Sequence, residues 1–157
     1  MRTKLTIIIF TALVMFCARP AGAQSITIVN DLTFGDVFPG IPKSVLKYTP
    51  GAAAEYLITG TAGAEITIDF TLPTYMNAGG YNMQLVFREN DCAMDSSSTP
   101  DQTDPGYDNI DPWHTITYRL GSSGLTVWLG GLVIPKLKQQ QGDYSGTIVM
   151  TVNYTGN

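Results

Sequence analysis

A long irregular stretch near the middle of the chain is the most evident place for chemistry. Residues 89–112 hold six aspartates, spaced three to six residues apart. Hard cations such as Ca²⁺ take six to eight oxygen ligands, which carboxylates on a loop can supply. The candidate Ca²⁺ ligands are therefore Asp101, Asp104, Asp108 and Asp111. Their spacing is not that of an EF-hand loop, so a solvated acidic loop with no cofactor is the other interpretation.

The chain holds few of the side chains that catalysis needs. His114 is its only histidine, and no nucleophile motif lies near it, so the sequence offers no Ser–His–Asp or Cys–His set. One histidine and one mature-chain cysteine cannot fill the three or four positions of a zinc site. The turn at residues 60–63 joins two predicted strands and does not open a phosphate-binding helix. We predict no catalytic residue and expect the chain not to be an enzyme.

Two tryptophans are candidates for an aromatic binding surface. Trp128 lies on the side of its strand opposite the apolar residues Val127 and Leu129. This alternation predicts that its ring is exposed on the outer face of the sheet. Trp113 lies at the edge of the acidic loop. Aromatic rings beside carboxylates suit carbohydrate sites, although packing of the loop onto the sheet explains the same residues. The alternative function is therefore a secreted carbohydrate- or Ca²⁺-binding module that uses the acidic loop and Trp113.

The first 23 residues have the features of a signal peptide. A basic start is followed by an apolar run over residues 5–16 and by small residues at positions 21–23. The apolar run is too short for the roughly 20 residues of a membrane-spanning helix. We expect Gln24 to be the mature N-terminus and the protein to be exported to the periplasm, cell surface or extracellular space. No membrane anchor is expected after signal cleavage.

Charge and cysteine content restrict the mature chain further. Three of the nine Lys and Arg residues lie in the leader and all 13 acidic residues follow it, so residues 24–157 carry six basic residues and a formal charge of −7. That balance argues against nucleic acid and anionic membranes as partners. Cys92 is the one cysteine after the leader, so no disulfide can form within the mature chain. We expect an inert or loop-located free thiol, because no cationic residue adjoins it.

The elements that must carry these residues are strands. Residues 65–72 alternate strictly between apolar and polar side chains, and similar runs occur at 83–88, 115–120 and 125–129. Glycine and proline turns separate the runs, and no segment has helical spacing over ten residues. This pattern predicts an all-β, Ig-like or pilin-like two-sheet sandwich of about seven strands. It is a single domain over residues 24–157, with 89–112 as a long acidic loop insertion.

The last run has the strictest alternation and predicts a long strand with one face on a core. A terminal strand of this kind can close its own domain or pair with another chain. The strand-pairing motif comprises Gly142, Tyr144, Ile148, Met150, Val152 and Tyr154.

Three segments carry a resemblance to a known family. They are LTFGDVFPG at 32–40, AEYLITGTAGAEITIDFTLP at 54–73 and LTVWLGGLVIPKLKQQQGDYSGTIVMTVNY at 125–154. They resemble the bacterial domain of unknown function 4402, an exported β-sandwich-like domain that is similar in turn to spore coat protein U and the chaperone-usher pilins. The resemblance covers most of the mature chain except residues 89–112. It implies a non-enzymatic, fimbrial type of structural or adhesive cell-surface component.

The pilin comparison also concerns the two ends of the mature chain. Gly142, with Tyr154 twelve positions later, resembles the strand by which pilins are held by a periplasmic chaperone. The partners implied are other surface or pilus subunits or such a chaperone. Only residues 24–33 precede Phe34, and they are barely enough for both a first strand and a separate donor strand. We therefore expect the first strand, with Ile26 and Ile28 on one face, to stay in its own sandwich.

Overall fold

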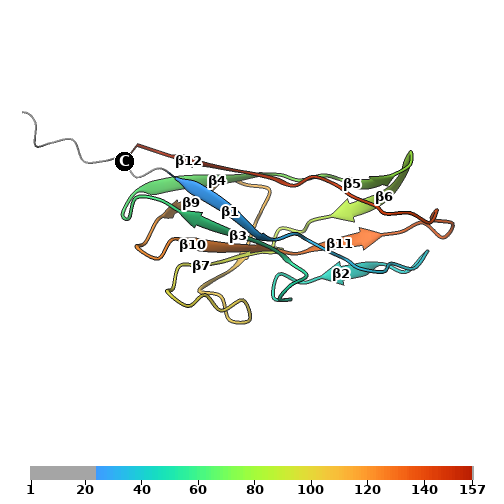
Figure 1. Cartoon of the computed structure of the whole chain (residues 1–157), viewed down its shortest axis with the longest axis horizontal. Helices are drawn as coiled ribbons and strands as arrows, with labels where there is room; N and C mark the ends of the chain where they lie inside the picture. Colours follow the sequence, from blue (N-terminus) through green and yellow to red (C-terminus); the bar gives the residue numbers. More distant parts are fainter. Residues whose placement is uncertain (1–23, 157) are drawn as a thin grey trace, which may run out of the picture.

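The computed structural model describes residues 24–156, and the signal peptide predicted for residues 1–23 lies outside them. The described chain is all-β, with twelve strands and no helix (Figure 1). The strands are β1 (Ser25–Asn30), β2 (Lys43–Val45), β3 (Ala54–Thr59), β4 (Glu65–Thr71), β5 (Tyr75–Ala78), β6 (Tyr81–Val86), β7 (Cys92–Asp95), β8 (Tyr107–Ile110), β9 (Ile116–Arg119), β10 (Leu125–Leu129), β11 (Gly131–Ile134) and β12 (Val149–Tyr154).

The strands form three antiparallel sheets. A five-stranded sheet has the order β1-β3-β10-β7-β8, a three-stranded sheet the order β12-β4-β9, and a four-stranded sheet the order β2-β11-β6-β5. The first two sheets occupy one half of the elongated molecule and the four-stranded sheet the other half (Figure 1). The prediction of an all-β sandwich is confirmed, but the described chain has more strands than the seven or so predicted.

Close backbone packing explains one of the additional strands. The predicted run from residue 125 to 134 is divided at Gly130 into β10 and β11, which belong to different sheets. A Cβ atom at Gly130 would lie 2.6 Å from the carbonyl oxygen of Val45 and 2.7 Å from the amide nitrogen of Lys47. Only glycine fits where these two backbones pass, and the chain changes sheets at that point.

One part of the core lies between the five-stranded and three-stranded sheets, and it continues into the four-stranded sheet through buried Val45, Leu85 and Val133. Ile66 and Ile68 of β4 are fully buried, and Tyr56 of β3 meets Phe70 of β4 with ring centroids 6.3 Å apart. Because side chains alternate along a strand, the odd-numbered residues of β10 face this core. Each buried aliphatic side chain contributes about 1.5–3 kcal/mol, so this face supplies much of the stability. The buried core residues of β10 are Leu125, Val127 and Leu129.

The outer face of β10 is buried as well, which corrects the prediction for Trp128. Its ring lies on the face opposite the core, as the alternation predicts, but it is only 2% exposed. Thr126 on the same face is also buried, as are Ala93 and Asp95, which lie opposite these two residues on β7. The exposed aromatic surface predicted at Trp128 is therefore wrong, because another layer of chain covers this face.

The C-terminal strand is shorter than predicted but has the predicted faces. β12 pairs with β4 over residues 149–154, and before it only Ser145 makes a bridge, to Asn77. Pro73, which has no N–H to donate, lies between β4 and β5 where this pairing is interrupted. Of the predicted core-facing residues, Val152 is buried, and the half-buried ones that pack against the core are Tyr144, Ile148 and Met150. Tyr154, predicted on the same face, is 37% exposed.

The first strand lies in its own sandwich, as predicted. Ile26 and Ile28 of β1 pair with Ile58 and Tyr56 of β3, so both isoleucines point toward the core side of the sheet. They are nevertheless 38% and 63% exposed. The core face is therefore open at this edge of the sandwich.

A pair of charge substitutions on β12 tests its face assignment. Val152→Asp places a carboxylate against fully buried Ile68 and should lower the free energy of unfolding by about 3 kcal/mol. Val149→Asp puts the same charge on the exposed face and should change it by less than about 0.5 kcal/mol. Chemical denaturation of both variants measures the difference. Equal losses would show that the strand does not present Val152 to the core.

Candidate functional site

Part of the predicted acidic loop is sheet. Residues 89–112 contain β7 and β8, and β7 pairs with β10 at the centre of the five-stranded sheet. The four residues of β7 are all buried. The insertion is therefore a structural part of the sandwich, and only its turns and the segment between the two strands are irregular. Alternation did not predict β7, because a strand that is buried on both faces does not alternate.

Cys92 is an inert thiol. It is the first residue of β7 and is fully buried. Burial raises the pKa of the thiol to about 12, against smaller opposing effects of the Lys47 charge and of a hydrogen bond with the Ala93 backbone. Since the thiolate is the nucleophilic form, the group has no reactivity near neutral pH.

Lys47 organises the irregular part of the insertion. Its side chain is only 5% exposed, and Nζ lies 2.6 Å from Oδ1 of Asp108. Nζ also donates to the carbonyl oxygen of Asn90 at 2.6 Å and to Oδ1 of Asn109 at 3.1 Å. Gln102 Nε2 donates to the Lys47 carbonyl at 2.7 Å. The side chain and the backbone carbonyl of Lys47 thus hold three separate parts of the insertion.

The carboxylate of Asp108 stays ionised beside Lys47. Burial alone would raise its pKa, but hydrogen bonds from Lys47, Tyr48 and the Asn109 backbone outweigh burial and hold the pKa below its usual value. Tyr48 donates its hydroxyl to Oδ2 of Asp108 at 2.5 Å, and this bond raises the pKa of Tyr48 to about 12. The Lys47 ammonium also lies 5.0 Å from the Tyr48 ring centroid. Asp108 is therefore the counter-ion of Lys47.

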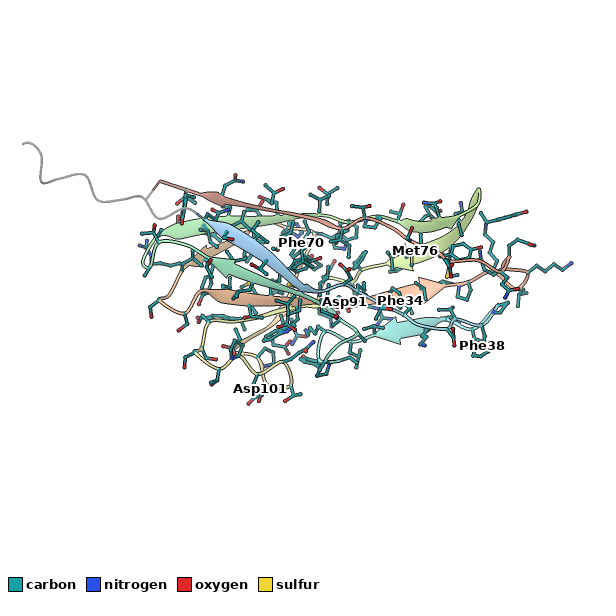
Figure 2. All side chains as sticks on the ribbon, viewed as in Figure 1. Phe34, Phe38, Phe70, Met76, Asp91 and Asp101 are labelled. Atoms are coloured by element: carbon teal, nitrogen blue, oxygen red, sulfur yellow. The ribbon has the colours of Figure 1, made fainter. Side chains whose placement is uncertain are left out.

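The four aspartates proposed as calcium ligands are not brought together. Asp101 accepts hydrogen bonds from the backbone and hydroxyl of Thr103 at 2.8 and 2.7 Å, and it lies on the protruding loop in Figure 2. Asp108 pairs with Lys47, while Asp104 is exposed. Asp111 accepts from the backbone of Trp113 at 2.9 Å. Within residues 24–156 no three His, Cys, Asp or Glu side chains are grouped so that they could hold a metal ion.

Asp111 positions the neighbouring aromatic residues. Besides the Trp113 amide, it bonds Nδ1 of His114 at 2.7 Å, and the amide bond followed by the His114 bond lowers its pKa despite some desolvation. Trp113 is 48% exposed, and its indole Nε1 donates to the Phe87 carbonyl at 3.0 Å. The Trp113 ring is therefore held by its edge while much of its surface faces solvent.

A hollow of about 720 Å³ lies beside Trp113 and opens broadly to solvent. Residues from three stretches of chain surround it: the turn at residues 87–90 that follows β6, one residue of β8, and the tryptophan. The sequence predicted Trp113 as a site residue but not its neighbours, because their proximity depends on the pairing of distant strands. The lining residues are Phe87, Arg88, Glu89, Asn90, Asn109 and Trp113.

A second hollow, of about 1030 Å³, lies in the half of the molecule that holds the four-stranded sheet. Met76, Met83 and Val133 of that sheet line it, together with residues 32–39 and 139–144. Phe34, Phe38 and Met76 are labelled in this half in Figure 2. Gly142 and Tyr144 of the strand-pairing motif lie along its rim, and Gln139 Nε2 donates to the Tyr144 hydroxyl at 2.6 Å. The strand-pairing motif therefore does not form one strand: Gly142 and Tyr144 line this hollow, and its last three residues belong to β12.

Lys47 is a site residue that the motifs did not predict, although the sequence holds a signal for it. Val45 and Lys47 are two residues apart and so share a face in an extended chain, and Val45 is buried. A lysine on an apolar face must find acceptors, since burying an unpaired ammonium costs several kcal/mol. Its acceptors could not be named from the sequence, because Asn90 and Asp108 lie more than forty residues away.

Replacing Lys47 tests its role. Lys47→Met should lower the free energy of unfolding by about 2 kcal/mol at pH 7, because the bonds to Asn90, Asp108 and Asn109 are lost together. This is below the usual cost of breaking a fully buried pair, since Asp108 is partly exposed. The exposed Lys43 is a matched control, and Lys43→Met should cost less than about 0.5 kcal/mol.

Lys47→Met should also change how the free energy of unfolding depends on pH. The folded-state pKa of Asp108 is depressed, so its stabilisation is present above the unfolded value of about 3.9 and is lost as pH falls through the folded pKa. Denaturation between pH 7 and pH 3 should therefore show a smaller acid-induced loss for Lys47→Met than for wild type. Parallel pH curves for the two proteins would contradict the ion-pair assignment.

Calcium addition tests the loop directly. Since the four aspartates take separate partners, millimolar Ca²⁺ should shift the melting temperature of residues 24–157 by less than about 1 °C, with Mg²⁺ as control. A larger rise with Ca²⁺ alone would show that the loop rearranges around the ion. Asp101→Asn/Asp104→Asn should then abolish the rise while leaving the Lys47–Asp108 pair intact.

No protein-family model matches the chain, and no curated protein matches its sequence. Residues 24–156 contain no helix long and apolar enough to cross a membrane. The fold, its open edge and its two hollows are the observations from which a function can be proposed.

Proposed function

We propose that this protein is a non-enzymatic, exported structural or adhesive component of the cell surface, with a pilin-like β-sandwich. The observation that carries the proposal is the open edge between β1 and β12. Each is the end strand of its sheet: β1 pairs with β3 alone and β12 with β4 alone among the described strands. An unpaired strand edge is a template for a strand of another chain.

The two strand edges lie on the same side of the sandwich. Gln24, which immediately precedes β1, donates from Nε2 to the carbonyl oxygen of Val152 in β12 at 2.5 Å. Near this place the inward-facing Ile26 and Ile28 remain accessible to solvent. On the other side, β8 and β9 are joined by Tyr107 and Tyr118, whose rings meet edge to face at 5.3 Å. One side is therefore closed by an aromatic pair. On the other side Gln24 bridges the two strands at one end only, and the exposed Ile26 and Ile28 are available to a partner.

Strand addition at this edge would give both affinity and specificity. Main-chain hydrogen bonds supply affinity, and apolar side chains such as Ile28 offer contacts that a matching strand can cover. The partners we propose are other surface or pilus subunits, or a periplasmic chaperone that holds the edge before assembly. Nucleic acid is a poor partner for a mature chain with a formal charge of −7.

The arrangement of reactive groups favours a role without catalysis. His114 is highly exposed, and its ring is held by Asp111 with no hydroxyl or thiol bonded to it among the described residues. Cys92 is buried and protonated. A hydrolase of the triad type needs a nucleophile within hydrogen-bond reach of its histidine. We therefore propose that the protein acts through its surfaces.

Site-directed photo-cross-linking in cells that make the full chain tests this proposal. A benzophenone amino acid at Ile28 should cross-link to another exported subunit or a second copy, and surface protease should remove the product. Ile41, which is 61% exposed against 63% for Ile28, is the matched control and should give little product. Mass spectrometry identifies the partner. A chain that stays inside the cell, or equal cross-linking from both positions, would refute the proposal.

A further inference from the structure

The hollow beside Trp113 has the parts of a saccharide-binding site. We propose that it binds a neutral sugar unit of a longer glycan chain, an inference that rests on the adhesive part of the proposed function. The Trp113 ring supplies the flat apolar platform, and the turn after β6 supplies hydrogen-bonding side chains. The hollow is open to solvent rather than enclosed, so the rest of a longer glycan can extend out of it.

The tryptophan ring is positioned before any ligand arrives. Its Nε1–H is satisfied by the Phe87 carbonyl, its backbone amide by Asp111, and the intervening Pro112 is fully buried. The ring cannot turn away without losing these bonds, yet 48% of the residue remains exposed. The face of an aromatic ring carries partial negative charge and attracts the partly positive C–H groups of a sugar face.

The turn that faces the platform is also rigid. Arg88 N–H donates to Oδ2 of Asp91 at 2.8 Å, and Asp91 N–H donates back to the Arg88 carbonyl at 3.1 Å. Gly130 N–H then donates to the Asp91 carbonyl at 2.8 Å and fixes the turn to the end of β10. Lys47 holds the turn from the other side through the Asn90 carbonyl. A preorganised site loses less conformational entropy when a ligand binds.

The side chains of this turn are free to bind a ligand. Arg88, Glu89 and Asn90 are exposed, and their side chains have no hydrogen-bond partner among residues 24–156. Guanidinium, carboxylate and amide groups together donate to and accept from the hydroxyl groups of a sugar. Asn109 completes the wall, and its backbone is held at φ 53° while Lys47 and Asp108 bind its side chain. Asparagine tolerates this left-handed conformation better than other non-glycine residues, and these side-chain bonds hold it there.

Charge selects the class of saccharide. Arg88 and Glu89 contribute one positive and one negative charge to the rim, so the hollow has no net attraction for an anion. The rest of the mature chain is acidic and disfavours sulfated, phosphorylated or uronic glycans. A neutral sugar with several hydroxyl groups uses every lining group without burying an unpaired charge.

A glycan array followed by calorimetric titration tests the site in the mature chain. Neutral oligosaccharides should bind, and Trp113→Ala should weaken that binding at least about tenfold. Arg88→Ala and Asn90→Ala should each weaken it about threefold. Tyr81→Ala is the matched control, since Tyr81 is a similarly exposed ring on β6 outside the hollow, and it should bind as wild type does.

Fluorescence gives a second readout from the same samples. A bound sugar should shift the emission of Trp113, whereas the buried Trp128 should contribute a constant background. If Trp113→Ala proves unstable on melting, the Arg88 and Asn90 variants decide the question, because their side chains have no partner to lose. The inference is overturned if no glycan binds, if only acidic glycans bind, or if these variants bind as wild type does. Ile28 cross-linking that persists in that case would leave the proposed function standing.

Discussion

The organisation of residues 89–112 depends on the bonds made by the buried ammonium group of Lys47. An ammonium in a dry environment costs several kcal/mol unless its charge and its hydrogen bonds are all compensated. Here Asp108 supplies the charge, while Asn90 and Asn109 supply further oxygens. These acceptors lie on separate parts of the insertion, so satisfying one side chain requires the whole segment to settle against the sheet.

That requirement explains why the sandwich has an additional layer here. Beyond β7 the chain turns back at Asp95, whose carboxylate accepts from the amides of Ser97 and Asp101, and Gln102 then reaches the Lys47 carbonyl. The outer face of β10 is buried in this region, and the ring of Trp128 with it. Trp128 Nε1 has no partner among the described residues, a cost of about 1–3 kcal/mol that the burial of so large a ring offsets.

Periodicity predicted much of the fold because most strands have one buried face. The alternation of β4 and β12 correctly assigned Ile66, Ile68 and Val152 to the core. It missed β7, which is buried on both faces, and the division at Gly130, which depends on the approach of a distant backbone. For the candidate site, the sequence could point to Trp113 as an aromatic residue beside an acidic segment. It could not place Asn90 and Asn109 beside it, because a contact between distant segments has no local signal.

The order of strands in the five-stranded sheet has a consequence for how the protein reaches its folded state. β10 lies between β3 and β7, so neither neighbour can complete its pairing until residues 125–129 have emerged from the ribosome. Most contacts in this domain join residues far apart in the chain, and domains of that kind fold in milliseconds to seconds rather than microseconds. During that interval the apolar faces of β3 and β4 are uncovered and prone to aggregation. A chain with this topology therefore completes its core late, and it gains from any partner that shields its strands until residues 125–129 are present.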